Sequence, residues 1–155
     1  MEVGRDRPGT VMVKAINPSG NSDMSDLTNI DGTLYFAAND GTNGKELWKS
    51  VMVKDLDTGN PAGSEPSDLT NVNGTLYFEA GAGLEIGGEL FKPDGTSAGT
   101  VLVKNIFPGA ESSNPTDLTN VDGTLYFEAD DGLDGDELWK STASSTSLPT
   151  QILAT

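Results

Sequence analysis

The chain contains no cysteine and no histidine among its 155 residues. These absences exclude disulfides, thiol nucleophiles, and any metal site or acid–base catalysis that depends on thiolate or imidazole. Basic residues are also scarce, because nine Lys and Arg stand against 24 Asp and Glu, for a formal net charge of −15. A chain this acidic repels phosphate backbones and anionic membrane surfaces, so nucleic acid is not expected as a partner.

Long apolar runs and helical periodicity are missing as well. No segment approaches the length of a membrane span, so membrane insertion is not expected, and the first residues lack the apolar core of a signal peptide. The 19 glycines and 8 prolines interrupt the chain too often for helices. An all-β chain is therefore expected.

What the chain does contain is one segment that occurs three times. Asp26–Phe36 recurs with few changes as Asp68–Phe78 and Asp117–Phe127. The first two copies start 42 residues apart (68 − 26), and the last two start 49 apart (117 − 68). A repeat of this length indicates one supersecondary unit that is placed side by side several times.

Each unit is expected to hold four short strands. Asp31-Gly32, Asn73-Gly74 and Asp122-Gly123 stand between apolar runs. Such pairs are the strongest short signal for a hairpin with a type I′ turn, whose two central residues both need positive φ. A Glu-Leu-Trp-Lys or Glu-Leu-Phe-Lys segment forms the third strand, and Val-Met-Val-Lys or Val-Leu-Val-Lys the fourth. The turn between them is shorter after Ser50 than in the second unit.

Consecutive apolar residues, such as Leu34-Tyr35-Phe36, predict strands that are covered on both faces. The blades of a β-propeller meet that condition, and 42–49 residues suit a blade, whereas a sandwich leaves one face of each strand wet. We therefore expect an all-β fold of three four-stranded antiparallel propeller blades. Three blades are too few for a ring, so the ring is closed by oligomerisation or the chain is part of a longer array.

These units divide the chain into residues 1–24, 25–66, 67–115 and 116–155. The first range contains Val11, Met12, Val13 and Lys14, which align with the fourth strand Val101–Lys104. They are predicted to be the last strand of a blade whose other strands are absent, and an unpaired strand seeks a partner. Val11–Lys14 is thus the predicted assembly strand. The last range ends in a degenerate tail that is a candidate fourth strand of the third unit.

Three short segments and their flanking strands resemble the bacterial ELWxxDGT repeat family: Glu46–Ser50, Glu89–Thr96 and Glu137–Ser141. The likeness covers nearly the whole chain, apart from the first residues and the tail after Ser141. No unit carries the complete motif, because Phe91 replaces Trp in the second and the first lacks Asp-Gly-Thr. The resemblance implies a secreted or cell-surface protein of bacteria with propeller-like repeats and no established catalytic activity.

The loops between the second and third strands carry the oxygens that calcium prefers. Two interpretations stay open for them, a calcium site or Asx and Gly turns that only join strands. The pattern does not match an EF-hand. No cofactor is required by the sequence, and calcium is the one candidate. The residues concerned are Asn39, Asp40 and Asn43 in the first unit, and Asp130, Asp131, Asp134 and Asp136 in the third.

Trp48, Phe91 and Trp139 occupy one strand position in the three units. Exposed aromatic rings there would stack on sugars, as in lectins, whereas buried ones would pack between blades. A similar choice applies to the recurring carboxylates, which either line a channel or fix local turns. The carboxylates are Asp26, Asp68 and Asp117.

The function expected from these features is that of a non-enzymatic, extracellular repeat protein. It would be a structural or adhesive element at the cell surface, which assembles with itself through contacts between blades and through strand exchange. The alternative is a carbohydrate-binding propeller with a glycan as partner. A hydrolase is the third hypothesis, with Asp and Glu as its only acid–base groups.

Overall fold

The computed structural model describes residues 12–83, 85–94, 96, 99–142 and 150–151. Its regular structure is entirely β, in three antiparallel sheets that follow one another along the chain. Within these ranges no helix is long and apolar enough to cross a membrane. The prediction of an all-β chain with short antiparallel strands is confirmed.

Each sheet is a simple meander in which neighbours in the chain are neighbours in the sheet. The third sheet has three long strands and a fourth of only two residues. The strands are β1 (Ser25–Ile30), β2 (Thr33–Asn39), β3 (Lys45–Trp48) and β4 (Met52–Lys54); β5 (Ser67–Val72), β6 (Thr75–Gly81), β7 (Gly88–Pro93) and β8 (Thr100–Lys104); and β9 (Thr116–Val121), β10 (Thr124–Asp130), β11 (Asp136–Thr142) and β12 (Thr150–Gln151).

The predicted two-residue turns are present in all three units. In the first, Ile30 pairs with Thr33, and the residues between them have φ of 47° (Asp31) and 82° (Gly32). Asn73-Gly74 and Asp122-Gly123 repeat these positive values. Positive φ at both central positions is the signature of a type I′ turn, whose twist matches that of the flanking strands. The hairpin prediction is confirmed.

The turn glycine allows a direct test of this geometry. We expect Gly32→Ala to lower the free energy of unfolding by about 1–2 kcal/mol, because a Cβ at φ +82° is strained although nothing lies within 4 Å of it. Gly59→Ala is the matched control, since Gly59 also has open space and has no positive φ. Chemical denaturation measures both. Equal effects of the two substitutions would contradict the turn assignment.

The shortened turn after Ser50 changes the outer edge of the first sheet. The N–H of Lys49 donates to the carbonyl of Val51 at 2.9 Å, so β3 and β4 end at the Trp48–Met52 pair. In the second sheet the corresponding strands continue to the Pro93–Thr100 pair. The extra length of the second sheet helps to line a hollow of about 380 Å³ against the first, to which Lys92, Pro93 and Asp94 contribute.

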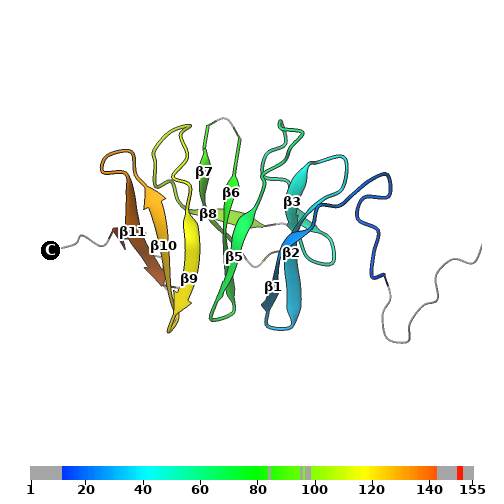
Figure 1. Ribbon diagram of the computed structural model, residues 1–155, viewed down its shortest axis with the longest axis horizontal. Helices are drawn as coiled ribbons and strands as arrows, with labels where there is room; N and C mark the ends of the chain where they lie inside the picture. Colours follow the sequence, from blue (N-terminus) through cyan, green and yellow to red (C-terminus); the bar gives the residue numbers. More distant parts are fainter. Residues whose placement is uncertain (1–11, 84, 95, 97–98, 143–149, 152–155) are drawn as a thin grey trace, which may run out of the picture.

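The three sheets stand side by side in chain order, with the hairpins β1–β2, β5–β6 and β9–β10 turned to the same end (Figure 1). The apolar core lies between the sheets and is divided into two clusters. One joins the first and second sheets, and the other joins the second and third. In the described part of the chain the sheets do not close into a ring.

The predicted assembly strand is not part of any sheet. Met12, Val13 and Lys14 have no regular structure and are exposed, and the side chain of Val13 is 96% accessible. Val11, the first residue of the predicted strand, lies outside the described residues. In the described part of the chain, the prediction that this segment forms a paired strand is not borne out.

Candidate functional site

The contact between successive sheets is the site to which most of the repeated residues contribute. It begins at the first strands, β1, β5 and β9. The hydroxyl of Thr28 donates to the carbonyl of Leu69 in the next unit at 2.8 Å. In the other direction, the side-chain amide of Asn71 donates to the carbonyl of Asn29 at 2.8 Å. The second interface repeats both bonds, from Thr70 to Leu118 and from Asn120 to Asn71, at 3.0 Å each.

A buried glutamate forms the second part of each interface. Glu46 begins the apolar part of β3 and is fully inaccessible. Its carboxylate accepts the N–H of Ser64 at 2.8 Å, the hydroxyl of the same serine, and the N–H of Leu56 at 3.5 Å. Ser64 lies just before β5, so the carboxylate binds the start of the next unit. Burial raises the pKa of Glu46, against the effect of these donors.

Glu89 repeats this arrangement one unit later. It is also fully inaccessible, and it accepts the N–H of Ile106 at 2.9 Å and of Phe107 at 3.3 Å. Its other bonds come from Ser113, through the N–H at 3.3 Å and the hydroxyl at 2.7 Å. Because a buried carboxylate is costly without donors, the four bonds make its position specific. We call Glu46 with Ser64, and Glu89 with Ser113, the glutamate clamps.

Apolar side chains complete the interface between the glutamate clamp and the first strands. We call the face of a sheet that is directed to the following unit its tail face. The face that is directed to the preceding unit is its head face. Val72, Tyr77 and Leu90 form the tail face of the second unit. They pack on the head face of the third unit, which consists of Leu118, Leu125, Phe127, Ala129 and Trp139. The first interface uses the corresponding residues, including Ile30 and Leu47 against Leu69, Leu76, Phe78, Ala80 and Phe91.

One further carboxyl group, that of Glu79, is partly buried near the contact between sheets. Burial, together with the neighbouring carboxylates of Asp68, Glu89 and Glu65, raises the pKa of Glu79 to about 7. The Ser67 hydroxyl, which donates to Glu79 at 2.9 Å, acts in the opposite direction. Glu79 is therefore partly protonated at neutral pH, where an exposed glutamate is ionised.

Glu79→Gln is expected to stabilise the protein at alkaline pH. The folded-state pKa of about 7 exceeds the reference value of 4.5, so the folded state binds more protons between these values. The free energy of unfolding therefore falls as pH rises through this window. The variant should flatten that fall and gain about 1–3 kcal/mol at pH 8. Urea denaturation from pH 4.5 to pH 8 measures it.

Glu128→Gln is the control for this substitution, because Glu128 holds the same strand position in the third unit and is exposed. It should leave the pH profile as in the wild type. A Glu79→Gln profile parallel to the wild type would contradict the shifted titration of Glu79.

The recurring aspartates lie at the start of the first strand of each unit. Asp26, Asp68 and Asp117 have φ of 55°, 54° and 54°, and the hydroxyl of the threonine two residues on donates back to each aspartate carbonyl. The backbone of each aspartate thus makes the same local turn, and whether the carboxylates fix that turn or line a channel stays a prediction. Burial, and then the charges of Asp26 and Asp117, raise the pKa of Asp68.

The structure places Trp48, Phe91 and Trp139 in the interior. All three are buried, and the indole N–H groups of the tryptophans donate to the carbonyls of Ala38 and Ala129 at 2.9 Å. Phe91 stacks on Phe78 with a centroid separation of 6.1 Å. Phe91 and Trp139 belong to the clusters between sheets, whereas Trp48 is buried outside both clusters, with the ammonium of Lys14 over its ring.

The acidic loops act as turns in this structure. Asp40 accepts the N–H groups of Thr42 and Asn43 at 2.8 Å each, and the bond from Asn43 lowers the pKa of Asp40. Asp130 and Asp131 accept the N–H groups two residues on. Among the described residues, no three acidic side chains are grouped so as to hold a metal ion. Calcium binding at Asn39, Asp134 and their neighbours stays a prediction.

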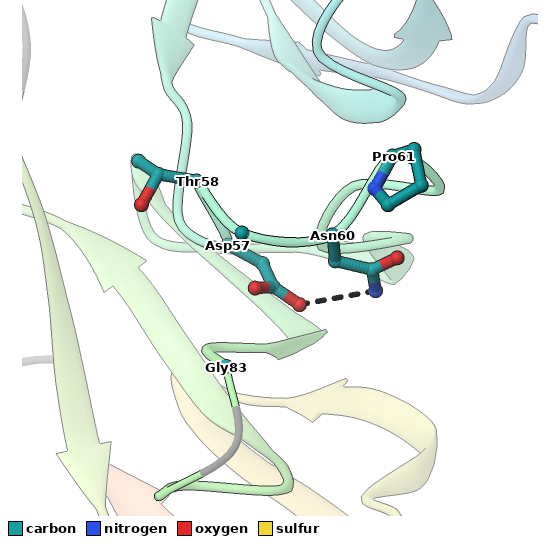
Figure 2. Close-up of a pocket in the computed structure, with 6 residues that line it drawn as sticks. Asp57, Thr58, Asn60, Pro61 and Gly83 are labelled. Carbon is teal, nitrogen blue, oxygen red and sulfur yellow. Dashed lines mark hydrogen bonds between the residues drawn. The ribbon is translucent and has the colours of Figure 1, made fainter.

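An open hollow of about 620 Å³ lies where the loop after β4 meets the second unit. Figure 2 shows Asp57, Thr58, Asn60 and Pro61 on this loop and Gly83 opposite. The Asn60 amide donates to the Asp57 carboxylate at 3.1 Å. The hollow thus has one carboxylate, that of Asp57, and Asn60 of the same loop already donates to it. The described residues that line the hollow carry no convergent set of polar groups for a ligand.

Neither family models, nor curated proteins, nor solved structures provide a match to this chain. Its architecture and its repeated interface are therefore the features that bear on its function.

Sequence reasoning missed the glutamate clamps. One signal was available, since Glu46, Glu89 and Glu137 each begin an apolar strand segment that was expected to be covered on both faces. A charge in such a strand needs buried donors. Ser64 and Ser113, at a fixed distance before the next Asp-Leu-Thr-Asn segment, were the donors to look for.

Proposed function

We propose that this chain is a non-enzymatic structural repeat protein whose sheets are β-propeller blades. The observation that carries the proposal is the use of the repeated residues. Glutamate and threonine positions contact the following sheet, asparagine and aromatic positions contact the preceding one, and leucines contribute on both sides. The carboxylates of Glu46 and Glu89 are occupied by N–H and hydroxyl donors. Groups that are bound in this way are not free to act on a substrate.

The meander order of each sheet and the stacking of sheets through apolar faces support the blade assignment. Three blades do not close a propeller ring, so a ring would need further blades, from other chains or from a longer array. Its resemblance to ELWxxDGT repeats and its strong negative charge suit an extracellular, surface-exposed element with an adhesive or architectural role.

Sedimentation analysis over a range of concentrations tests the proposal. A particle larger than the 16.2 kDa chain is expected, with assembly that increases with concentration. A folded protein that stays a single chain up to about 100 μM, where weak specific interfaces already associate, would overturn it.

A further inference from the structure

The head face of the first unit is open at its leucines, although the corresponding leucines elsewhere are buried, while Ala38 and Trp48 on the same face are buried. Leu34 is 49% exposed, whereas Leu76 and Leu125 at the same position are 2% and 0% exposed. Leu27 is exposed as well, and its counterparts Leu69 and Leu118 are buried. The first unit thus presents the surface that the second and third units place against a preceding sheet.

The tail face of the third unit is open in the complementary way. Leu138 is 50% exposed, whereas Leu47 and Leu90 are 2% and 0% exposed. Val121 is exposed, and Glu137 is only partly buried, where Glu46 and Glu89 are inaccessible. The third unit thus presents the surface that the first two units place against a following sheet.

The polar groups at the two ends match the same interface. Thr119 donates to the carbonyl of Asp117 in its own unit at 2.8 Å, where Thr28 and Thr70 also donate to the next unit. At the other end, Asn71 and Asn120 donate their side-chain amides to the preceding unit, and Asn29, exposed like Asn120, is their counterpart in the first unit. The third unit thus offers the threonine donor of an interface between units, and the first unit offers the asparagine donor.

The segment Met12–Lys14 lies where the fourth strand of a preceding blade would lie. Lys104, the last residue of β8, places its ammonium 4.6 Å from the ring centroid of Trp139 in the following unit. Lys14 does the same to Trp48 at 5.3 Å. The segment already contacts the first unit as β8 contacts the third, while the sheet that it would extend is missing from the described part of the chain.

We propose that the partner of this surface is a second copy of the chain, bound head to tail. The Glu137 carboxylate of one copy accepts the N–H and hydroxyl of Ser22 of the other, as Glu89 does with Ser113. Leu138 and Val121 pack on Leu27 and Leu34. Met12–Lys14 takes the β11 edge in place of β12, which pairs there in the single chain and has to leave it on assembly. This inference rests on the proposed structural function and names its partner, direction and residues.

The contact between two copies would continue the interfaces that are already formed within the chain. The chain contains two copies of this interface, with the same residues on the same faces. A contact between unlike faces is heterologous and has a direction, and it can close on itself. Two copies would place six sheets in sequence, which is within the range of four to eight blades in known propellers.

Complementation between two variants tests the direction. Leu34→Asp introduces a charge on the head face, and Leu138→Asp on the tail face. Each alone should weaken self-association by about 100-fold or more, because the charge would be buried without a partner. An equimolar mixture should form a particle of two chains, since it contains one intact head and one intact tail. Leu133→Asp is the control, at an 84% exposed loop residue.

Mass photometry and sedimentation measure these species, and circular dichroism confirms that each variant folds. Self-association of either variant alone at wild-type strength would overturn the head-to-tail inference and leave the proposed function intact. So would a mixture that stays single chains. A wild-type protein that never associates would instead overturn the proposed function itself.

Glu137→Gln tests the predicted glutamate clamp between copies. Exchange of the carboxylate for an amide replaces one acceptor by a donor, so the association constant should fall about tenfold. Glu111→Gln, on the exposed loop before β9, should leave it unchanged. Equal association constants for the two variants would show that Glu137 and Ser22 do not take part in the contact.

Discussion

Replacement of Glu89 by alanine is expected to lower the free energy of unfolding by about 3–5 kcal/mol. The substitution removes a buried carboxylate and leaves the N–H groups of Ile106 and Ser113 without their acceptor, while the Ser113 hydroxyl keeps only the Gly88 carbonyl at 3.3 Å. Each buried donor without a partner costs about 1–3 kcal/mol, and the cavity left by the side chain adds to this. Urea denaturation followed by circular dichroism measures the loss.

Glu137→Ala is the matched control for this prediction. It makes the same substitution at the same motif position, in the one unit whose glutamate is partly exposed. Measured at a protein concentration at which the chains stay single, it should change stability by less than about 0.5 kcal/mol. A loss at Glu89 no larger than at Glu137 would show that the glutamate clamp does not stabilise the interface.

Trp139→Ala is expected to cost about 3–5 kcal/mol, the usual loss for a large aromatic side chain removed from a core. The ring packs in the cluster between the second and third sheets, and its N–H donates to the carbonyl of Ala129 at 2.9 Å. The ammonium of Lys104 also lies over its face. The thermal midpoint and a denaturant titration report the loss.

Trp139→Phe separates packing from hydrogen bonding at this site. Phe91 shows that phenylalanine fits the same position in the second unit, where it is also buried. The variant keeps a ring and loses the indole bond, so a cost of about 1 kcal/mol is expected. A Trp139→Ala protein that folds normally and loses affinity for glycans would favour the lectin alternative over packing between sheets.

The local elements of this fold are predictable because their signals are short-range. The Asp31-Gly32 pair and its two counterparts determine a turn through positive φ, which few residues tolerate. The alternation of such turns with β-branched and aromatic residues then defines the hairpins. Each strand is signalled by a handful of neighbouring residues, and the sheets confirm it.

The contacts between units are harder to predict because their partners are distant in the sequence. The choice between a sugar-binding and a packed Trp139 depends on whether a second sheet covers it, which the single strand does not encode. Glu46 looks like a surface residue until Ser64, eighteen positions later, is placed beside it. The acidic loop at Asp40 is similar, because its carboxylate is occupied by N–H groups that composition alone does not reveal.

Phe91 takes the place of tryptophan in the middle unit, and this gives the array two separate optical reporters. Trp48 lies in the first unit and Trp139 in the third, and each is buried among the residues of its own end. Variants that keep a single indole would therefore emit from one end of the chain only. Fluorescence during unfolding would then show whether the two ends melt together or one after the other, with no dye attached.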